Sequence, residues 1–152
     1  MARFIALACV LLAACAVASE FDQFDSTVEV VDNINTYLVD NPDAELIELQ
    51  AQSMPFAKTR YTFGQRVNGD RVLAQRNDNF NYGRMQDVRL NLNYPQWGVG
   101  AIVTYLEVIL EYNSNMGKLY IVGGGIGQRS IKLVMEANGV THFAASSTLW
   151  GY

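Results

Sequence analysis

The stretch KLYIVGGGIGQRSIKLVME, from Lys118 to Glu136, contains residue types that could bind a flavin or nicotinamide dinucleotide. Its apolar run, its glycines and the apolar pattern that follows are close to the opening of a dinucleotide-binding fold. Such a site needs glycine at the sixth position of G-x-G-x-x-G, but Gln128 stands there when the motif starts at Gly123. It also needs an acidic residue about 20 residues further on, and none follows Glu136. We therefore predict a turn between two strands and no cofactor.

His142 is the only histidine of the chain, and both cysteines, Cys9 and Cys15, lie near its beginning. A Ser-His-Asp or Cys-His arrangement would depend on this one imidazole, and no G-x-S-x-G elbow accompanies it. A zinc site is not indicated, because neither H-x-x-x-H nor C-x-x-C spacing occurs. We interpret His142 as a structural or surface residue and expect no catalytic and no metal-binding residue.

The carboxylate pair of a glycosidase would have to come from four acidic residues, namely Asp78, Asp87, Glu107 and Glu111. Glu107 and Glu111 lie on one face of a predicted strand, which is more simply interpreted as a solvated face. The sequence therefore predicts a protein that is not an enzyme.

Six arginines within about 30 residues could indicate a surface for nucleic acid or a glycan, because aromatic side chains lie nearby. The arginines are Arg60, Arg66, Arg71, Arg76, Arg84 and Arg89, and the aromatic residues are Tyr82, Tyr94 and Trp97. They alternate with acidic residues, and the pI of about 4.9 lies far below that of a typical nucleic-acid-binding domain. We therefore expect a soluble hairpin edge and no direct contact with nucleic acid.

The elements that must position these residues are strands, beginning near Tyr61. Segments 61–67 and 71–75 flank Asn68 and Gly69, which can supply the positive φ angles of a tight hairpin turn. In 88–94, apolar residues alternate with polar ones.

The longest predicted strand is 102–112, with apolar residues on one face (Ile102, Leu106, Val108, Leu110) and Tyr105, Glu107 and Glu111 on the other. Further strands are expected over 119–122, 130–137 and 141–150, with Asn138 and Gly139 as another turn. This succession predicts an all-β fold, a single antiparallel β-sandwich or barrel-like domain over residues 59–152.

Residues 20–58 carry a net charge of −8, whereas residues 59–152 carry +3. In this acidic segment, Ser26 and Glu29 form a capping box that predicts a helix over 27–39. Asn41 and Pro42 predict a second helix that ends near Met54. We expect a short acidic helical segment that docks on the domain or stays partly disordered. Alternatively, it is a prosegment that charge holds to the basic part until it is removed.

Residues 1–19 have the pattern of a secretory signal peptide: Arg3, an apolar run over 4–15, and then small residues. This run is too short for a membrane span of about 20 residues, and no second long one follows. The LAAC sequence at 12–15 leaves a bacterial lipidation site as the alternative. We expect an extracellular, secreted protein without a membrane span.

Five pieces of sequence, in this order, resemble the insect multiprotein bridging factor two family: YTFGQRVNGDRVL, VRLNL, IVTYLEV, YIVGGGIGQRSIKLVM and TLWGY. The resemblance covers about 61–152, and its most specific piece runs from Gly123 to Met135. It implies a signal peptide and one compact β domain, as in the secreted, salivary type of this family. The proline that usually follows the double glycine is absent, and Trp150 stands where tyrosine is common.

Three functions are compatible with these observations. The first is a secreted, non-enzymatic binding protein with an unknown protein or surface partner, in a fluid such as saliva, gut content or haemolymph, as the resemblance implies. The second is a transcriptional co-activator, as the family name implies, although an exported chain would not meet nuclear partners. The third is a carrier of small hydrophobic ligands in a cavity between the sheets.

After expression in cells of a related organism, we expect the mature protein in the medium, beginning at Ser19 or Glu20, because small residues precede both positions. Intact mass and N-terminal sequencing of medium and cell extract check this. A start at 59–61 would reveal a removed prosegment, and a chain that keeps Met1 and stays in the extract would contradict export.

Overall fold

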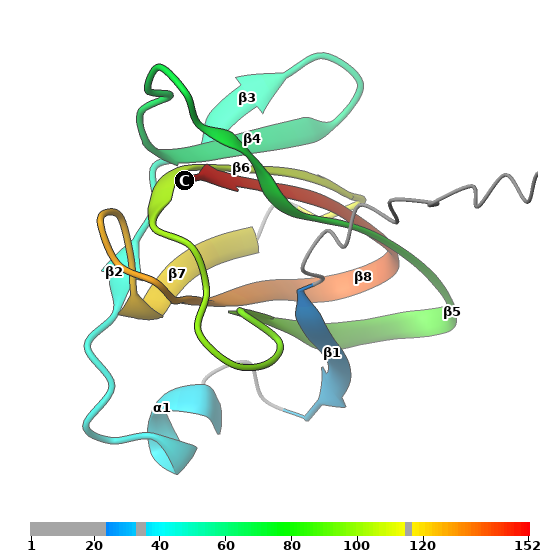
Figure 1. The fold of residues 1–152 in the computed structure, drawn as a ribbon. Helices are drawn as coiled ribbons and strands as arrows, with labels where there is room; N and C mark the ends of the chain where they lie inside the picture. Colours follow the sequence, from blue (N-terminus) through cyan, green and yellow to red (C-terminus); the bar gives the residue numbers. More distant parts are fainter. Residues whose placement is uncertain (1–23, 33–35, 115–116) are drawn as a thin grey trace, which may run out of the picture.

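The computed structural model describes residues 24–32, 36–114 and 117–152 (Figure 1). The predicted signal peptide, 1–19, lies outside the described residues. Within the described ranges, no helix has the length and apolar character needed to cross a membrane.

The predicted all-β fold is confirmed, because the described chain forms one antiparallel sheet of eight strands with a single short helix, α1 (Thr36–Asp40). The strands are β1 (Asp25–Val31), β2 (Ile47–Glu48), β3 (Gln52–Met54), β4 (Lys58–Gly64), β5 (Arg71–Tyr94), β6 (Val103–Tyr112), β7 (Gly117–Gly124) and β8 (Ile131–Gly151). Their main order in the sheet is β1-β5-β8-β6-β4-β3, and β7 lies between β8 and β2.

Strand β8 holds the sheet together because it pairs with β5 along its whole length and with two strands on its other side. β7 pairs with residues 131–137 of β8, and β6 pairs with residues 143–151. The sheet therefore divides into two halves, one containing β1 and β7 and the other containing β4 and β6.

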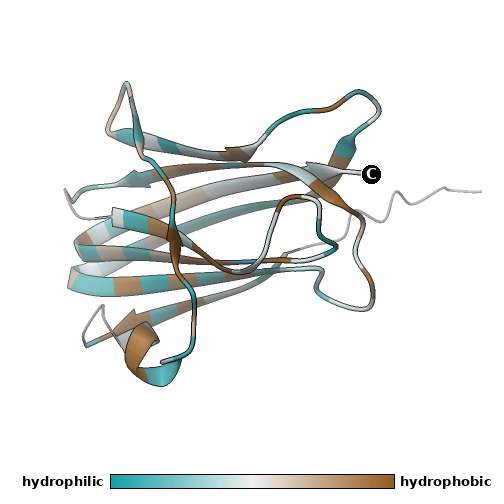
Figure 2. Cartoon of the chain, turned by 90° about the vertical axis from the view of Figure 1, so that its left-hand side faces the viewer, coloured by the Kyte–Doolittle hydropathy of each residue, from teal (hydrophilic) through white to brown (hydrophobic). Residues whose placement is uncertain are grey.

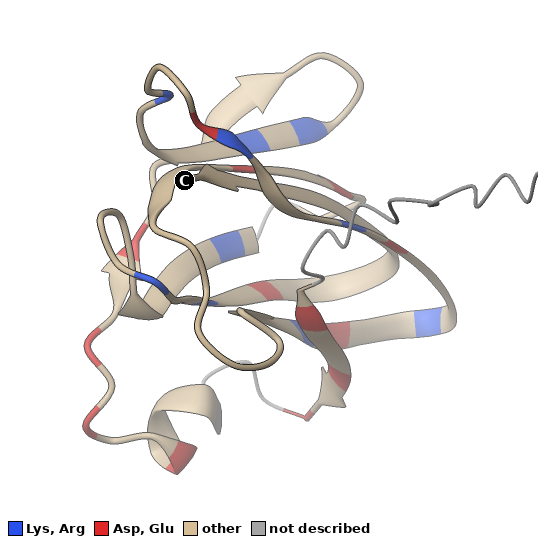
Figure 3. Ribbon diagram, viewed as in Figure 1, with Lys and Arg blue, Asp and Glu red and all other residues tan. Residues whose placement is uncertain are grey.

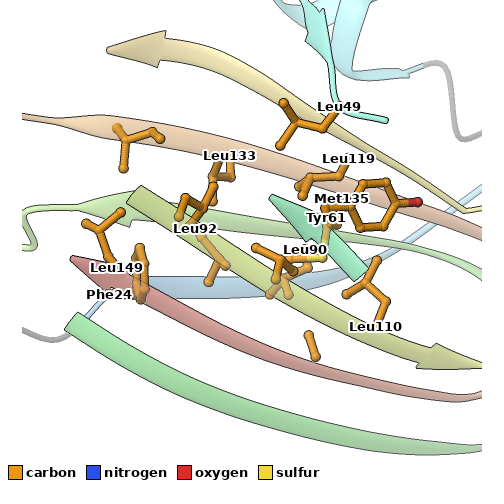
Figure 4. Close-up of a cluster of buried hydrophobic side chains, with 14 of the residues drawn as sticks. Phe24, Leu49, Tyr61, Leu90, Leu92, Leu110, Leu119, Leu133, Met135 and Leu149 are labelled. Atoms are coloured by element: carbon orange, nitrogen blue, oxygen red, sulfur yellow. The ribbon is translucent and has the colours of Figure 1, made fainter. Parts of the chain in front are cut away.

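The two halves fold over each other and enclose one core (Figures 1 and 4). Leu106 and Leu110 of β6 belong to the same buried cluster as Leu90 of β5 and Leu133 of β8. The hydroxyl of Tyr61 on β4 donates a hydrogen bond to the carbonyl oxygen of Gly117 on β7, at 3.2 Å, although these strands are not neighbours in the sheet. The arrangement is a sandwich made from one folded sheet.

Hydrophobic and hydrophilic residues follow each other along the strands (Figure 2), and this alternation assigns side chains to the core or to solvent, as predicted. In β6, Leu106, Val108 and Leu110 are completely buried, whereas Glu107 and Glu111 lie on the outer face. Burial of alternate apolar side chains on both halves is the main favourable contribution to folding.

The predicted turn at Asn138 and Gly139 is wrong, because β8 continues through both residues. Gly139 has a φ of +63° and lies where the register between β5 and β8 shifts. Its N–H donates a 2.8 Å hydrogen bond to the carboxylate of Asp87. The two residues thus form a bulge that bends a long strand, a role for which glycine is as suitable as it is for a turn.

The turn at Asn68 and Gly69 is present, but the predicted hairpin is wrong. Gly69 has a φ of +87°, and the Asp70 N–H donates to the carbonyl oxygen of Val67 at 3.2 Å. β4 nevertheless pairs with β3 and β6, whereas β5 pairs with β1 and β8. Local turn residues fix the reversal of the chain, but distant strands determine the pairing.

The two helices predicted over 27–39 and 41–54 are also wrong: in the described part of this segment the helix is confined to α1, and β1, β2 and β3 occupy much of the remainder. The β-branched residues of DSTVEVV fit a strand, and Val28 pairs with Leu90 of β5. The residues of the supposed capping box face distant partners instead: Ser26 donates to Asp78 at 3.2 Å, and Glu29 accepts from Arg89 at 2.7 Å.

The acidic segment is joined to the rest of the sheet by core contacts and ion pairs. Phe24 and Leu49 belong to the buried cluster. Two ion pairs also link the segment to the rest of the sheet, Glu29 with Arg89 at 2.7 Å and Glu48 with Lys118 at 3.3 Å.

Substitution of Gly124 and Gly139 by alanine can separate the cost of backbone strain from the cost of a steric clash. Gly124 and Gly139 have similar φ angles, +67° and +63°, so alanine at either position costs about 1 kcal/mol for the left-handed conformation. At Gly124 the new Cβ would also lie 2.1 Å from the Ser130 carbonyl oxygen, whereas at Gly139 it meets no atom within 4 Å. In urea unfolding, we expect Gly124→Ala to lose at least twice as much free energy as Gly139→Ala, and equal losses would contradict the loop geometry.

Candidate functional site

The glycine-rich stretch connects β7 to β8, so the predicted turn between two strands is confirmed. Gly124, Gly125 and Gly127 all have positive φ angles, and the Gly125 N–H donates to the Ser130 carbonyl oxygen at 2.9 Å. The segment that follows is strand β8, whereas a dinucleotide motif leads into a helix whose N-terminus holds the pyrophosphate.

This glycine loop packs against the beginning of β6. The Gly127 N–H donates to the Val103 carbonyl oxygen, and the Val103 N–H donates to the Gln128 carbonyl oxygen, both at 2.8 Å. The side chain of Ile126 lies over Gly64, where an added Cβ would come within 2.5 Å of the Ile126 Cδ1. Glycine at position 64 therefore provides the space that Ile126 occupies.

A groove of about 750 Å³ opens where this loop, the β4–β5 connection and the start of β6 meet. We name it the loop-end groove, and it is lined by Gly64, Gln65, Val67, Asn68, Ile102, Val103, Thr104, Ile126, Gly127 and Tyr152. No charged side chain is among these residues, and the exposed ones include Val67, Ile126 and Tyr152. The volume falls in the range that small-molecule sites occupy.

Asp70 fixes the β4–β5 connection that forms one wall of this groove. Its carboxylate accepts hydrogen bonds from the Arg66 guanidinium at 2.7 and 3.0 Å, from the Val67 N–H at 3.0 Å and from the Thr104 hydroxyl at 2.9 Å. These bonds hold the pKa of Asp70 well below its usual range, with Arg66 as the largest cause. Arg66 also lies over the Trp150 ring, 4.8 Å from the centroid.

His142 lies on the outer face of β8, where it contacts amide groups. Its Nδ1 is 2.9 Å from the Oδ1 of Asn81, and its backbone N–H donates to the Oδ1 of Asn113 at 3.1 Å. His142 is half-buried, and these contacts hold it between two asparagine side chains.

The four carboxylates considered for acid–base chemistry have different partners. Glu107 and Glu111 share the outer face of β6 as predicted, where they pair with Arg60 and Lys58 of β4. Asp78 accepts from Arg76 at 2.9 Å and from Ser26. Asp87 is the acceptor at the Gly139 bulge described above. In the part of the chain that the structure describes, no three His, Cys, Asp or Glu side chains gather as metal ligands would.

The arginines do not form the single hairpin edge expected from the sequence, because their strands separate in the sheet (Figure 3). Arg66 lies beside the loop-end groove, and Arg76 pairs with Asp78. Arg89 is only 9% exposed, pairs with Glu29 and lies over the Tyr37 ring of α1 at 5.5 Å.

The sequence did not indicate the loop-end groove. Its lining comes from separate segments of the chain. They meet only because β4 pairs with β3 and β6 whereas β5 pairs with β1 and β8. Two features of the sequence belong to the groove, the glycine loop and the Asn68-Gly69 turn. Each predicted a reversal of the chain, but neither predicted that the two loops lie next to each other in the fold.

In a comparison with protein families, residues 63–151 match the model described as transcription activator MBF2. The matched range includes all of the residues that line the groove except Tyr152. No curated protein and no solved structure matches the chain.

Asp70→Asn is expected to lower the urea midpoint near neutral pH, because it replaces a charged acceptor of hydrogen bonds from four donor groups. A carboxylate with a depressed folded-state pKa stabilises the fold above its unfolded pKa of about 3.9, and this contribution is lost as the pH falls through the folded value. The difference between Asp70→Asn and the native chain should therefore be constant from about pH 7 to 5 and shrink below about pH 4. The exposed Asp43→Asn is the control; a difference independent of pH for Asp70→Asn would contradict this role.

Proposed function

Because the chain belongs to the transcription activator MBF2 family, and because of the groove described above, we propose that it is a secreted, non-enzymatic protein that binds partners through the loop-end groove. The observation that carries this proposal is an uncharged, partly apolar hollow of about 750 Å³ between loops on a rigid sandwich. Loops held on a rigid scaffold are common places for recognition.

The chemistry of the groove favours an uncharged, apolar group as its occupant. The lining offers a charged ligand no side chain of opposite charge to offset its lost hydration, and the neighbouring Arg66 is already paired with Asp70. Val67, Ile126 and Tyr152 offer apolar surface that remains in contact with water. Covering such surface is favourable by roughly 25 cal/mol per Å². Either the apolar side chains of a partner protein or a small hydrophobic molecule fits this description.

The description of the family favours a second candidate function, that of a transcriptional co-activator. The signal peptide expected over residues 1–19 supports export instead. The location and the N-terminus of the mature chain, as measured above, decide between the two.

The uncharged dye Nile red tests the groove directly. We expect its fluorescence to rise on binding the folded chain, and Ile126→Ser to weaken binding about five- to tenfold by removing apolar surface from the groove wall. Val99→Ser is the matched control, because Val99 is 84% exposed and is not part of the lining.

Val67→Ser is a second groove variant in case Ile126→Ser disturbs the contact with Gly64. Circular dichroism shows whether each variant keeps the fold. Unchanged dye binding in both groove variants, or an equal loss in Val99→Ser, would contradict the assignment of the groove.

A further inference from the structure

Four amide side chains occupy alternate positions of β5: Gln75, Asn77, Asn79 and Asn81. Alternate residues of a strand point to the same face, with a spacing of about 7 Å. All four are exposed, and the register places them opposite Thr148, Ser146, Ala144 and His142 of β8. We name this line of side chains the amide row.

A hollow of about 240 Å³ lies beside the middle of the amide row. Asn77 and Asn79 line one side, and the small residues Ala144 and Ser146 of the neighbouring strand leave the space open. Ile109 of β6 lies opposite Ser146 and contributes an apolar wall. The hollow therefore combines short polar groups with one aliphatic surface.

The charges that border the hollow are paired. Asp78 lines it and pairs with Arg76 at 2.9 Å, and Lys58 and Glu111, which line it as well, form an ion pair of 3.2 Å. An ionic ligand would have to compete with this pair, whereas a neutral ligand would not. An amide group both donates and accepts hydrogen bonds, which matches the hydroxyl groups of a neutral ligand.

We propose that the amide row and its hollow bind a neutral oligosaccharide. Sugar hydroxyls hydrogen-bond to the amides of Asn77 and Asn79, and the aliphatic face of a ring lies against Ile109. This site is separate from the loop-end groove and does not depend on the proposed function.

The edge of β5 gives an independent reason to favour a sugar over another protein strand. In the described part of the chain, residues 71–81 of β5 pair only with β8, so their other edge is open. Arg76 and Asp78 alternate with the amides on the opposite face of the strand and form a 2.9 Å ion pair there. Charged residues that point inward from an edge discourage the addition of another strand.

Titration of the ¹⁵N-labelled full mature chain with chitohexaose, cellohexaose and maltohexaose, each to millimolar concentration, tests the proposal by NMR. We expect the side-chain NH₂ signals of Asn77 and Asn79 to shift with at least one of these probes, while those of Asn91 and Asn93 remain in place. No shift with any of the three, or shifts confined to other residues, would overturn the proposal.

The double variant Asn77→Ala/Asn79→Ala should weaken binding of that probe at least about tenfold, since two hydrogen-bonding groups are removed. Asn91→Ala/Asn93→Ala is the matched control, because it changes the same residue types at the same spacing in the part of β5 that pairs with β1. Equal weakening in both variants would also overturn the proposal. Nile red binding to the double variant should be unchanged, which separates this site from the groove.

Discussion

The fold depends on the shared pairing of β8. One strand of 21 residues pairs with β5 on one side and with β7 and then β6 on the other. Because the described residues form a single sheet and no second one covers its apolar face, that face is buried only if the two halves of the sheet bend towards each other. The bulge at Gly139 lies between the part of β8 that pairs with β7 and the part that pairs with β6. This bend brings the two halves of the sheet face to face as two layers, encloses the core between them and sets the positions of the loops.

The same arrangement separates two kinds of surface. At one end of the sandwich, loops from non-adjacent strands meet and leave an uncharged groove, whose wall is fixed by the hydrogen bonds of Asp70. On the outer face of the half that contains β4 and β6, short amides and small side chains surround a shallow hollow with one aliphatic wall. Among the residues that line these two surfaces, only Val103 and Ala145 belong to the buried hydrophobic cluster, so most of the lining can change without changing the core.

Local patterns predicted the class of the fold and several strands well, because alternation in 88–94 and 102–112 reports directly which side chains face the core. Local patterns gave wrong predictions where contacts with residues distant in sequence determine the structure. Ser26 and Glu29 have the spacing of a capping box, yet both side chains pair with residues of β5. Asn138 and Gly139 have turn chemistry, yet β5 continues the pairing on both sides of them. The loop-end groove could not be predicted for the same reason. The residues that form its walls are distant in sequence, and no local pattern indicates that they lie close together.

The central position of β8 also determines when the sheet can form. β8 follows all its partners in the chain, and Arg71 at the start of β5 pairs with Gly151 at its end. While the chain is being made, β5, β6 and β7 therefore exist without the strand that joins them. Closing so long a loop is entropically costly, and folds dominated by distant pairings form slowly. The pairs β1–β5 and β4–β6 can form earlier, but they cannot be joined until β8 has been synthesised, and during this interval the edges that later pair with β8 are available to chaperones.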